Sequence, residues 1–368
     1  MPFLVFILPN KTGIIIENDT PQETSTSTDT TQARIGLVYQ VVSIGFMLFF
    51  ALNGFFNKEL PGWGMLYAWL GLITGALLSH VPIKPVSRWW EQSGTKWMAI
   101  LLAHGGLIGL LIGIYGKPDL VWAAVAMALL TGANLWRFRR DVPEIFWVMS
   151  LALVVFSIDI NSWMTSVVGD EFSFHETAYR MSDIMDYQEL GKIIFRADGA
   201  HTSHTFISSL LQVISMKFLG SENFGWRFSN PYQCSLAVGL FYYFCSTFFS
   251  KKQSLVTAFL FSISSYIMAF SKIGYNNLQA MFALTFVLAT AAWIIRSGSR
   301  LSYVVLAYGL AYCFYAYPAA LYAIPLPLIL LIMYRPPRDM PTIKNWIWMV
   351  LICILMISPL LIQPEYWA

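Results

Sequence analysis

The sequence YNNLQAMFALTFVLATAAWIIR, residues 275–296, shows the pattern that indicates the fold class of this chain. No side chain in it is charged before Arg296. About 20 helical residues, each rising about 1.5 Å, are enough to cross ~30 Å of membrane hydrocarbon. Apolar runs of this kind recur along almost the whole chain. The sequence therefore predicts an all-α integral membrane protein with about eleven transmembrane helices.

The composition of the chain also favours a membrane protein. Apolar residues make up 57% of its 368 residues and charged residues 12%, whereas soluble domains carry about a quarter charged residues. The formal net charge of +3 gives no reason to expect a nucleic-acid partner. The four cysteines all lie inside apolar runs, so we expect no disulfides.

Several ranges have the length and apolar character of a membrane-spanning helix. They are 36–57, 63–82, 97–115, 119–136, 143–160, 228–250, 253–271, 275–296, 301–317, 318–334 and 345–363. A further apolar range, 205–219, is only about 15 residues long and follows a polar loop, so we expect a helix that lies along the membrane interface.

The short connections indicate the orientation of the chain, because cytoplasmic connections are enriched in Lys and Arg. Six basic groups fall in alternate connections: Arg34; Lys84, Arg88 and Lys96; Arg137, Arg139 and Arg140; Lys251 and Lys252; Arg296 and Arg300; and Arg335, Arg338 and Lys344. This alternation predicts a cytoplasmic N-terminus and places the loop 161–227 outside the membrane.

Three regions are expected along the chain. Residues 1–35 form a cytoplasmic N-terminal tail that is Ser/Thr-rich and partly disordered. Residues 36–141 hold four spans with short connections and few polar side chains. Residues 142–368 hold seven spans and the outside loop 161–227.

The outside loop is chemically unlike the rest of the chain. Between Asp159 and His204 it carries eight of the chain's twenty carboxylates and three of its five histidines. A solvated loop must be polar, which accounts for any single charge without a function. It does not account for a polar stretch of about 40 residues where the other connections are short, so we expect this loop to be structured or functional.

The segment Gly169-Asp170-Glu171 opens a predicted amphipathic helix over residues 171–190. The apolar face of this helix carries Phe174, Ala178, Met181 and Met185. Asp170 falls near its start, where a carboxylate can serve as an N-terminal cap. The same position suits a general base that takes a proton from a hydroxyl group at the outer face. The residues alone leave both interpretations open.

A metal site is another interpretation of the loop. Glu171 and His175 are spaced i, i+4, and His201 and His204 are spaced i, i+3, so each pair can share one helix face. Neither pair is a complete site. A divalent metal ion is therefore a candidate cofactor, with His175, His201 and His204 as candidate ligands, and no cofactor is certain.

The order of five segments resembles a known family. In chain order they are GDE (169–171), HTF (204–206), FGWRFS (224–229), FSKIGY (270–275) and YAYPAA (315–320). Together they resemble the type C glycosyltransferases, and in particular the bacterial relatives of the protein O-mannosyltransferase and aminoarabinose-transferase families. The resemblance covers about residues 143–363, which would form a seven-span glycosyltransferase-like module.

The resemblance implies a reaction and a location. Such enzymes move a sugar from a polyprenyl-phosphate donor to an acceptor hydroxyl at the outer face of the membrane, with inversion. The implied partners are the lipid-linked sugar and membrane lipids. The implied location is the bacterial inner membrane.

The resemblance also implies roles for individual residues. Asp170 corresponds to the catalytic carboxylate, acting as general base, with Glu171 beside it. The residues implied to bind the donor phosphate are Arg227, Lys272 and Arg196. Those implied to line the sugar pocket are Tyr315, Tyr317 and His204. Interfacial snorkelling of the cations and an aromatic belt would explain the same residue types without a ligand.

Departures from the family pattern keep an alternative open. Lys272 replaces an arginine, so a bidentate contact with phosphate is lost. The stretch 200–204 replaces a proline-rich one, and the chain ends where family members commonly continue. The alternative is a non-catalytic accessory or structural subunit of a larger membrane complex, with residues 36–141 docking protein partners. Transport is a third interpretation, which predicts ionisable residues inside the spans, and His104 is the main candidate.

Overall fold

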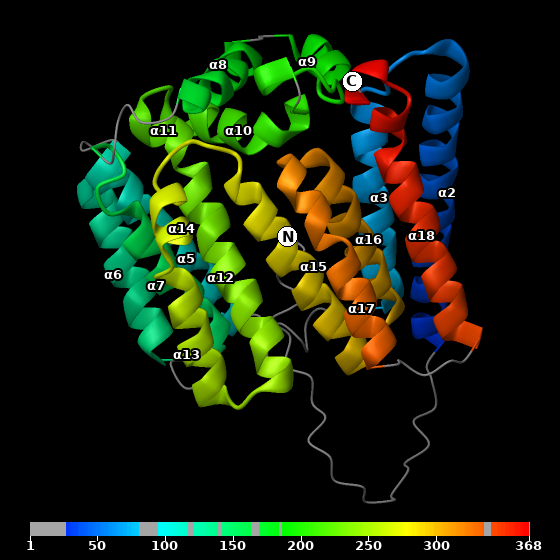
Figure 1. Cartoon of the computed structure of the whole chain (residues 1–368). Helices are drawn as coiled ribbons and strands as arrows, with labels where there is room; N and C mark the ends of the chain where they lie inside the picture. The colour runs from blue at the N-terminus through cyan, green and yellow to red at the C-terminus, as the bar shows by residue number, and fades with distance from the viewer. Residues whose placement is uncertain are drawn as a thin grey trace, which may run out of the picture.

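A computed structural model describes residues 27–80, 95–116, 121–137, 142–162, 169–183, 186–202, 204–334 and 340–367. Every regular element in these ranges is a helix, which confirms the all-α class. Figure 1 shows a bundle of long helices with a layer of short helices across one end. Most of the predicted tail, residues 1–35, lies outside the described residues.

A helix or a pair of consecutive helices occupies each range predicted as a span. The single helices are α2 (Ser27–Asn57), α3 (Trp63–His80), α6 (Val121–Arg137), α7 (Glu144–Ser157), α12 (Ser229–Phe248), α15 (Leu278–Ser297), α16 (Arg300–Tyr315) and α18 (Met340–Leu361). The pairs are α5 (Thr95–Leu111) with the π-helical turn η2 (Ile112–Gly116), α13 (Lys251–Ser262) with α14 (Ser265–Phe270), and η6 (Pro318–Ala323) with α17 (Pro325–Met333).

Length and composition decide which of these helices can cross a membrane. Within the described ranges, the four that qualify are Thr31–Asn57, Met98–Gly116, Leu278–Ser297 and Thr342–Leu361. Shorter apolar helices cover Trp63–Ser79, Glu144–Ser157, Phe206–Leu219 and Pro318–Met333. These helices are those of an all-α membrane protein, and the count of eleven spans stays a prediction.

Two of the predicted spans are interrupted. The range 318–334 changes at Pro325 from the 3-10 helix η6 to the α-helix α17, because a proline has no N–H to donate to the preceding turn. The range 253–271 divides between α13 and α14 at residues 263–264. A sequence window that counts apolar residues does not detect either break.

The polar loop that the sequence predicts to lie outside folds into a layer of short helices that we call the cap. It consists of α8 (Gly169–Asp183), α9 (Tyr187–Ile193), η4 (Ala200–Thr202), η5 (Phe206–Ser209), α10 (Leu210–Leu219) and α11 (Asn223–Arg227). The cap lies across one end of the bundle (Figure 1). The loop is therefore structured, as its length predicts.

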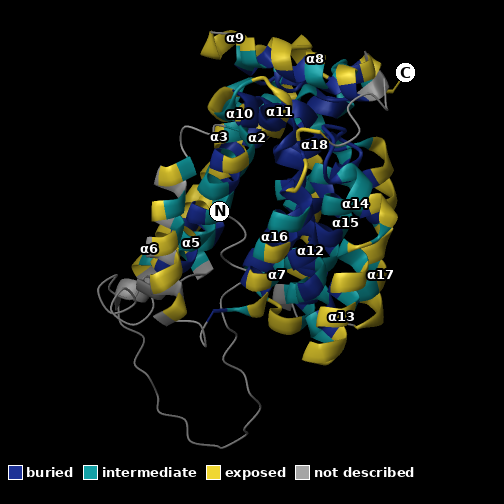
Figure 2. Ribbon diagram, turned by 90° about the vertical axis from the view of Figure 1, so that its left-hand side faces the viewer, coloured by how far each residue is buried: buried dark blue, intermediate teal, exposed yellow. Residues whose placement is uncertain are grey.

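The prediction of one helix over residues 171–190 is wrong. α8 ends at Asp183, and a second helix begins after Asp186, whose carboxylate accepts a hydrogen bond from Gln188 N over 2.8 Å. Such a capping contact starts a new helix. Figure 2 shows exposed positions on the outer side of the cap and buried ones toward the bundle. The buried positions of α8 include the predicted Phe174, Ala178 and Met181.

The cap and several basic connections lie at opposite ends of the bundle. α12 begins beside the cap and, with 20 residues, runs about 30 Å to its other end. There Arg296 donates a hydrogen bond to Ser246 O over 2.6 Å, and Lys251 pairs with Glu144. The predicted orientation needs this separation, and the orientation itself stays a prediction.

The four leading helices form two hairpins that pack in different places. α2 and α3 pack against α18 and α16, whereas α5 packs against α7 (Figure 1). The first hairpin also contacts the cap. Trp63 Nε1 donates to Tyr187 O over 2.7 Å, and the two rings stack with their centroids 4.4 Å apart. The α2–α3 hairpin therefore holds α9 in place.

Cysteine labelling tests the orientation. Glu176 in α8 and Lys252 in α13 are both exposed, and they lie on the cap and at the opposite end of the bundle. With a membrane-impermeant maleimide on intact cells, we expect Glu176→Cys to react. Lys252→Cys should react only after the membrane is opened, because a charged reagent does not cross hydrocarbon. The unsubstituted chain is the control for its own cysteines, of which Cys234, Cys245 and Cys313 are buried and Cys353 is partly buried. If only Lys252→Cys is labelled in intact cells, the orientation is the opposite of the predicted one.

Candidate functional site

The candidate site is built around one buried turn. The segment 271–277 joins α14 to α15 and is buried at every residue. We call it the central turn. Its backbone groups need partners, because an unpaired buried polar group costs about 1–3 kcal/mol. Side chains from the cap and from α12 supply several of these partners.

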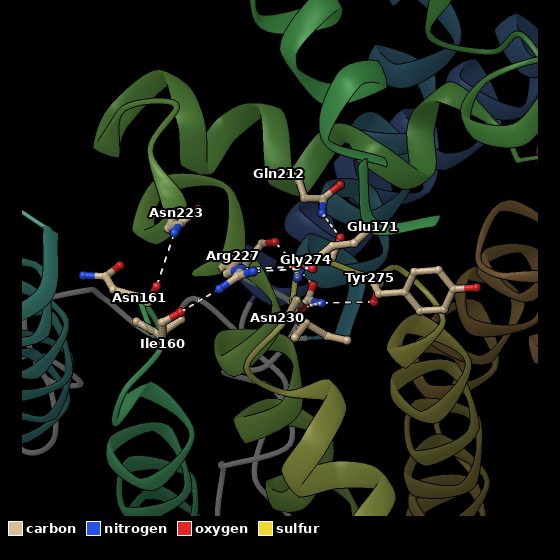
Figure 3. A network of polar contacts seen from close by, with 11 residues as sticks. Ile160, Asn161, Glu171, Gln212, Asn223, Arg227, Asn230, Gly274 and Tyr275 are labelled. Atoms are coloured by element: carbon tan, nitrogen blue, oxygen red, sulfur yellow. Dashed lines mark hydrogen bonds and ion pairs between the residues drawn. The ribbon is translucent and has the colours of Figure 1, made fainter. Parts of the chain in front are cut away.

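Glu171 of α8 is the charged partner of the central turn. Its Oε1 accepts a hydrogen bond from Gly274 N over 2.6 Å (Figure 3). The carboxylate also accepts from Arg227 of α11, with Oε1 3.1 Å from Nε and Oε2 3.4 Å from Nη2. Glu171 is 4% exposed and Arg227 is 1% exposed. A buried, hydrogen-bonded ion pair therefore attaches the cap to the central turn.

Arg227 also reaches the end of the preceding helix. Its Nη1 donates to Ile160 O over 3.1 Å, just beyond α7, and its guanidinium carbon lies 5.2 Å from the centroid of the Trp226 ring. Taking two charges out of water costs several kcal/mol per ion, which mutual attraction and hydrogen bonds must offset. The pair is therefore stabilising only while both members are present.

Two amide side chains bind the backbone of the central turn from opposite sides. Gln212 of α10 donates from Nε2 to Gly274 O over 2.7 Å. Asn230 of α12 donates from Nδ2 to Tyr275 O over 3.1 Å and also to Ile273 O. Cap and bundle thus share one short segment of backbone (Figure 3).

Lys272 lies in the central turn itself. Its Nζ donates to Ile158 O over 2.8 Å, and the residue is 5% exposed. Burial lowers the pKa of Lys272, and the charge of Asp159 acts in the opposite direction. An anion brought beside this ammonium group would favour its charged form in the same way as Asp159.

A second set of amides lies where the central turn enters α15. Asn276 Nδ2 and Gln279 Nε2 both donate to Ser208 O, over 3.3 and 2.6 Å. Within the described part of the chain, the side-chain oxygens of Asn276, Gln279 and Gln212 have no hydrogen-bond partner. Amide oxygens accept hydrogen bonds, so these groups suit water or a ligand that carries hydroxyl donors.

Aromatic rings cover another side of the central turn. The ring of Phe174 lies 5.1 Å from that of His204 and 5.2 Å from that of Tyr275, between centroids. His204 in turn stacks on Tyr317 at 5.2 Å, with 18° between the planes. We call these four residues the aromatic group. Phe174, His204 and Tyr275 are buried, and Tyr317 is partly exposed.

The structure brings most of the predicted site residues to this region. Glu171, Arg227 and Lys272 surround the central turn, and His204 and Tyr317 belong to the aromatic group. Asp170 lies in the first turn of α8, next to Glu171 in the chain, and its side chain lies outside the described part. The anchoring of Glu171 therefore also holds the backbone of Asp170 close to the central turn.

Two predicted site residues make their contacts elsewhere. Tyr315 is buried, and its hydroxyl donates to Met356 O over 2.6 Å while its ring packs on Trp69. Arg196 pairs with Asp198, with Nε 2.8 Å from Oδ1. Two residues of one sequence motif can face different parts of a structure, as Tyr315 and Tyr317 do.

The metal candidates show no shared ligand geometry. His175 packs edge-on against Trp226 at 5.0 Å, and the rings of His201 and His204 are 6.0 Å apart between centroids. Among the residues that the structure describes, no three His, Cys, Asp or Glu side chains are grouped as metal ligands. A divalent ion stays a prediction without a ligand set.

Comparisons of the chain with family models, with curated proteins and with solved structures find no match. The resemblance to type C glycosyltransferases therefore rests on the motifs quoted from the sequence. The structure adds that three of those motifs, around Glu171, Arg227 and Gly274, meet in one hydrogen-bonded network.

The amides of the site did not stand out in the sequence. Gln212, Asn230, Asn276 and Gln279 lie inside apolar runs, where their neighbours draw attention to hydrophobicity. A usable signal was nevertheless present, because polar side chains inside membrane helices are costly and are retained where they find partners.

The ion pair can be tested by its effect on stability. Arg227→Ala leaves Glu171 buried without its partner, so we expect a loss of about 3–5 kcal/mol in the free energy of unfolding in detergent. The matched control is Arg180→Ala, which breaks the exposed pair with Glu176 and should cost at most about 1 kcal/mol. The double variant Glu171→Leu with Arg227→Met should be less damaging than Arg227→Ala alone. Equal losses for the two single variants would contradict the structural role.

The close approach at the central turn gives a second test. A Cβ added at Gly274 would collide with the Trp226 ring, so Gly274→Ala must separate the central turn from α11. We expect a lower unfolding temperature than for the unsubstituted chain. Gly45→Ala in α2 is the control, because an added Cβ there meets nothing within 4 Å and alanine favours a helix by about 0.5–1 kcal/mol. If Gly274→Ala leaves the unfolding temperature unchanged, the central turn and α11 do not pack this closely.

Proposed function

We propose that the chain is a membrane glycosyltransferase that moves a sugar from a polyprenyl-phosphate donor to an acceptor at the outer face of the membrane. The observation that carries this proposal is the buried Glu171–Arg227 pair on Gly274 N. It joins three motifs of the resemblance and holds Asp170, which precedes Glu171, at the junction of cap and bundle. A catalytic group needs such a rigid support to keep its geometry.

In the proposed reaction, Asp170 acts as general base. The oxygen of an acceptor hydroxyl forms a bond to the anomeric carbon from the face opposite the lipid phosphate, so the configuration inverts. The bond from that carbon to the phosphate oxygen breaks, and its electron pair leaves with the polyprenyl phosphate. The hydroxyl proton passes to the Asp170 carboxylate.

The surroundings of the central turn support sugar binding in this proposal. The amide oxygens of Asn276 and Gln279 can accept hydrogen bonds from hydroxyl groups, and Tyr317 and His204 offer flat ring surfaces. Binding sites for small molecules commonly combine aromatic surfaces with a few placed polar groups. We keep Tyr317 and His204 as sugar-pocket residues.

The cations take different roles in the proposal. Arg227 has its carboxylate and carbonyl partners inside the protein, so we assign it, with Glu171, to positioning. Lys272 is the cation that we assign to the donor phosphate, because it lies in the central turn itself and a lysine ammonium group is a common point-charge partner of phosphate. Arg196 lies apart from the central turn and is treated separately below.

A second candidate function is that of an accessory subunit of a membrane complex. In this alternative the Glu171–Arg227 pair and the Lys272 contact are purely structural, because they already bind one another or the backbone. Partners would dock on the α2–α3 and α5–α6 hairpins. α2 exposes the large apolar side chains Val38, Val41, Val42, Phe46 and Phe49.

Substitution of the proposed base separates the two candidates. Asp170→Asn keeps the size of the side chain and removes its basicity, so we expect sugar transfer in proteoliposomes to fall at least about a hundredfold. Asp183→Asn, at the other end of α8, is the control and should retain activity. The assay uses a panel of radiolabelled polyprenyl-phosphate sugars, with the unfolding temperature measured in parallel. Transfer by Asp170→Asn at the rate of the control would reject the assigned base, and no transfer by the unsubstituted chain would favour the accessory role.

A further inference from the structure

A cavity of about 500 Å³ lies at the cap end of the bundle, apart from the central turn. The loop after α2, the segment after α9 and the turn after α18 form its walls. Its polar lining is Lys58, Arg196, Asp198, Gln363 and Glu365. Ligand sites typically have volumes of about 300–1,000 Å³, so this cavity has the size of a binding site.

The walls of this cavity are fastened to one another. Gln363 is buried, and its Oε1 accepts a hydrogen bond from Ala197 N over 3.0 Å. Its Nε2 donates to Phe195 O over 2.7 Å. One side chain from the turn after α18 thus holds the cap segment that carries Arg196. A site with fixed walls loses less entropy when a ligand binds.

The charges of the cavity are of both signs. Arg196 and Asp198 pair with each other, and the Arg196 guanidinium holds the pKa of Asp198 below its ordinary value. Within the described part of the chain, neither Lys58 nor Glu365 has an ion-pair partner. Both are exposed. The cavity therefore offers one cation and one carboxylate to a ligand, beside a pair that is already neutral.

The surroundings of the cavity are those of a membrane interface. Phe55 and Phe56, at the end of α2, are exposed, and so is Trp367. Trp side chains such as Trp367 are enriched where membrane helices meet the lipid headgroups. The last turns of α2 and the neighbouring α18 present apolar side chains, among them Leu52 and Ile354. A ligand with a polar head and apolar chains would match both surfaces.

We propose that this cavity binds the headgroup of a zwitterionic phospholipid that carries a phosphate and a primary ammonium group. The phosphate lies against Lys58, and the ammonium donates hydrogen bonds to Glu365. A primary ammonium fits better than a quaternary one because it has N–H donors for a carboxylate. The acyl chains follow the apolar surfaces of α2 and α18. This site is independent of the sugar-transfer reaction.

Native mass spectrometry of the full chain tests this proposal. The delipidated protein is titrated with short-chain phosphatidylethanolamine, phosphatidylglycerol and phosphatidylcholine. We expect phosphatidylethanolamine to bind about tenfold more tightly than the other two. Lys58→Ala should weaken the binding of phosphatidylethanolamine and of phosphatidylglycerol alike, because both lipids have the phosphate. Glu365→Gln should weaken only the binding of phosphatidylethanolamine, and its affinity should fall to that of phosphatidylglycerol.

The controls separate this site from general lipid adhesion. Glu59 is next to Lys58 in the chain but does not line the cavity. Glu59→Gln should therefore leave the affinities for all three lipids unchanged. Equal binding of the three lipids, or affinities that neither Lys58→Ala nor Glu365→Gln alters, would overturn the proposal. If free phosphoethanolamine binds as tightly as the lipid, the proposal that the ligand is a lipid is rejected. Sugar transfer is not measured, so failure here is distinct from failure of the transferase proposal.

Discussion

The contact on which the rest of the structure depends is the carboxylate of Glu171, held between Gly274 N and the guanidinium of Arg227. A buried turn between two helices leaves polar backbone groups that no helix can satisfy, and a buried arginine needs an anion. Glu171 meets both needs at once. Because Glu171 comes from the cap, the two requirements bring the cap onto the end of the bundle.

This contact explains why several elements meet at one short segment. α8 supplies Glu171, α10 supplies Gln212, and α12 supplies Asn230, and all three bind the backbone between Ile273 and Tyr275. The same segment carries Lys272, and α15 begins directly after it. A catalytic or a purely structural role would each use this rigidity. In the proposed transferase, it sets the position of Asp170.

The cap is also held at its far side by contacts that have nothing to do with the central turn. Trp63 stacks on Tyr187, and Gln363 binds the backbone of Phe195 and Ala197. These contacts come from the start of α3 and from the turn after α18. Gln363 also lines the charged cavity beside Arg196, so the cap presents two chemically different surfaces.

The sequence by itself determined the helical class, the positions of the apolar helices and the presence of a structured polar loop, because hydrophobic length and periodicity are local properties. The resemblance to type C glycosyltransferases also drew attention to Glu171, Arg227 and Lys272 as candidate site residues. Only the tertiary structure decided that Glu171 and Arg227 neutralise each other, that Tyr315 and Tyr317 have different surroundings, and that Arg196 lies apart. The Glu171–Gly274 contact joins residues 103 positions apart, and no local pattern records which distant partner a buried charge will find.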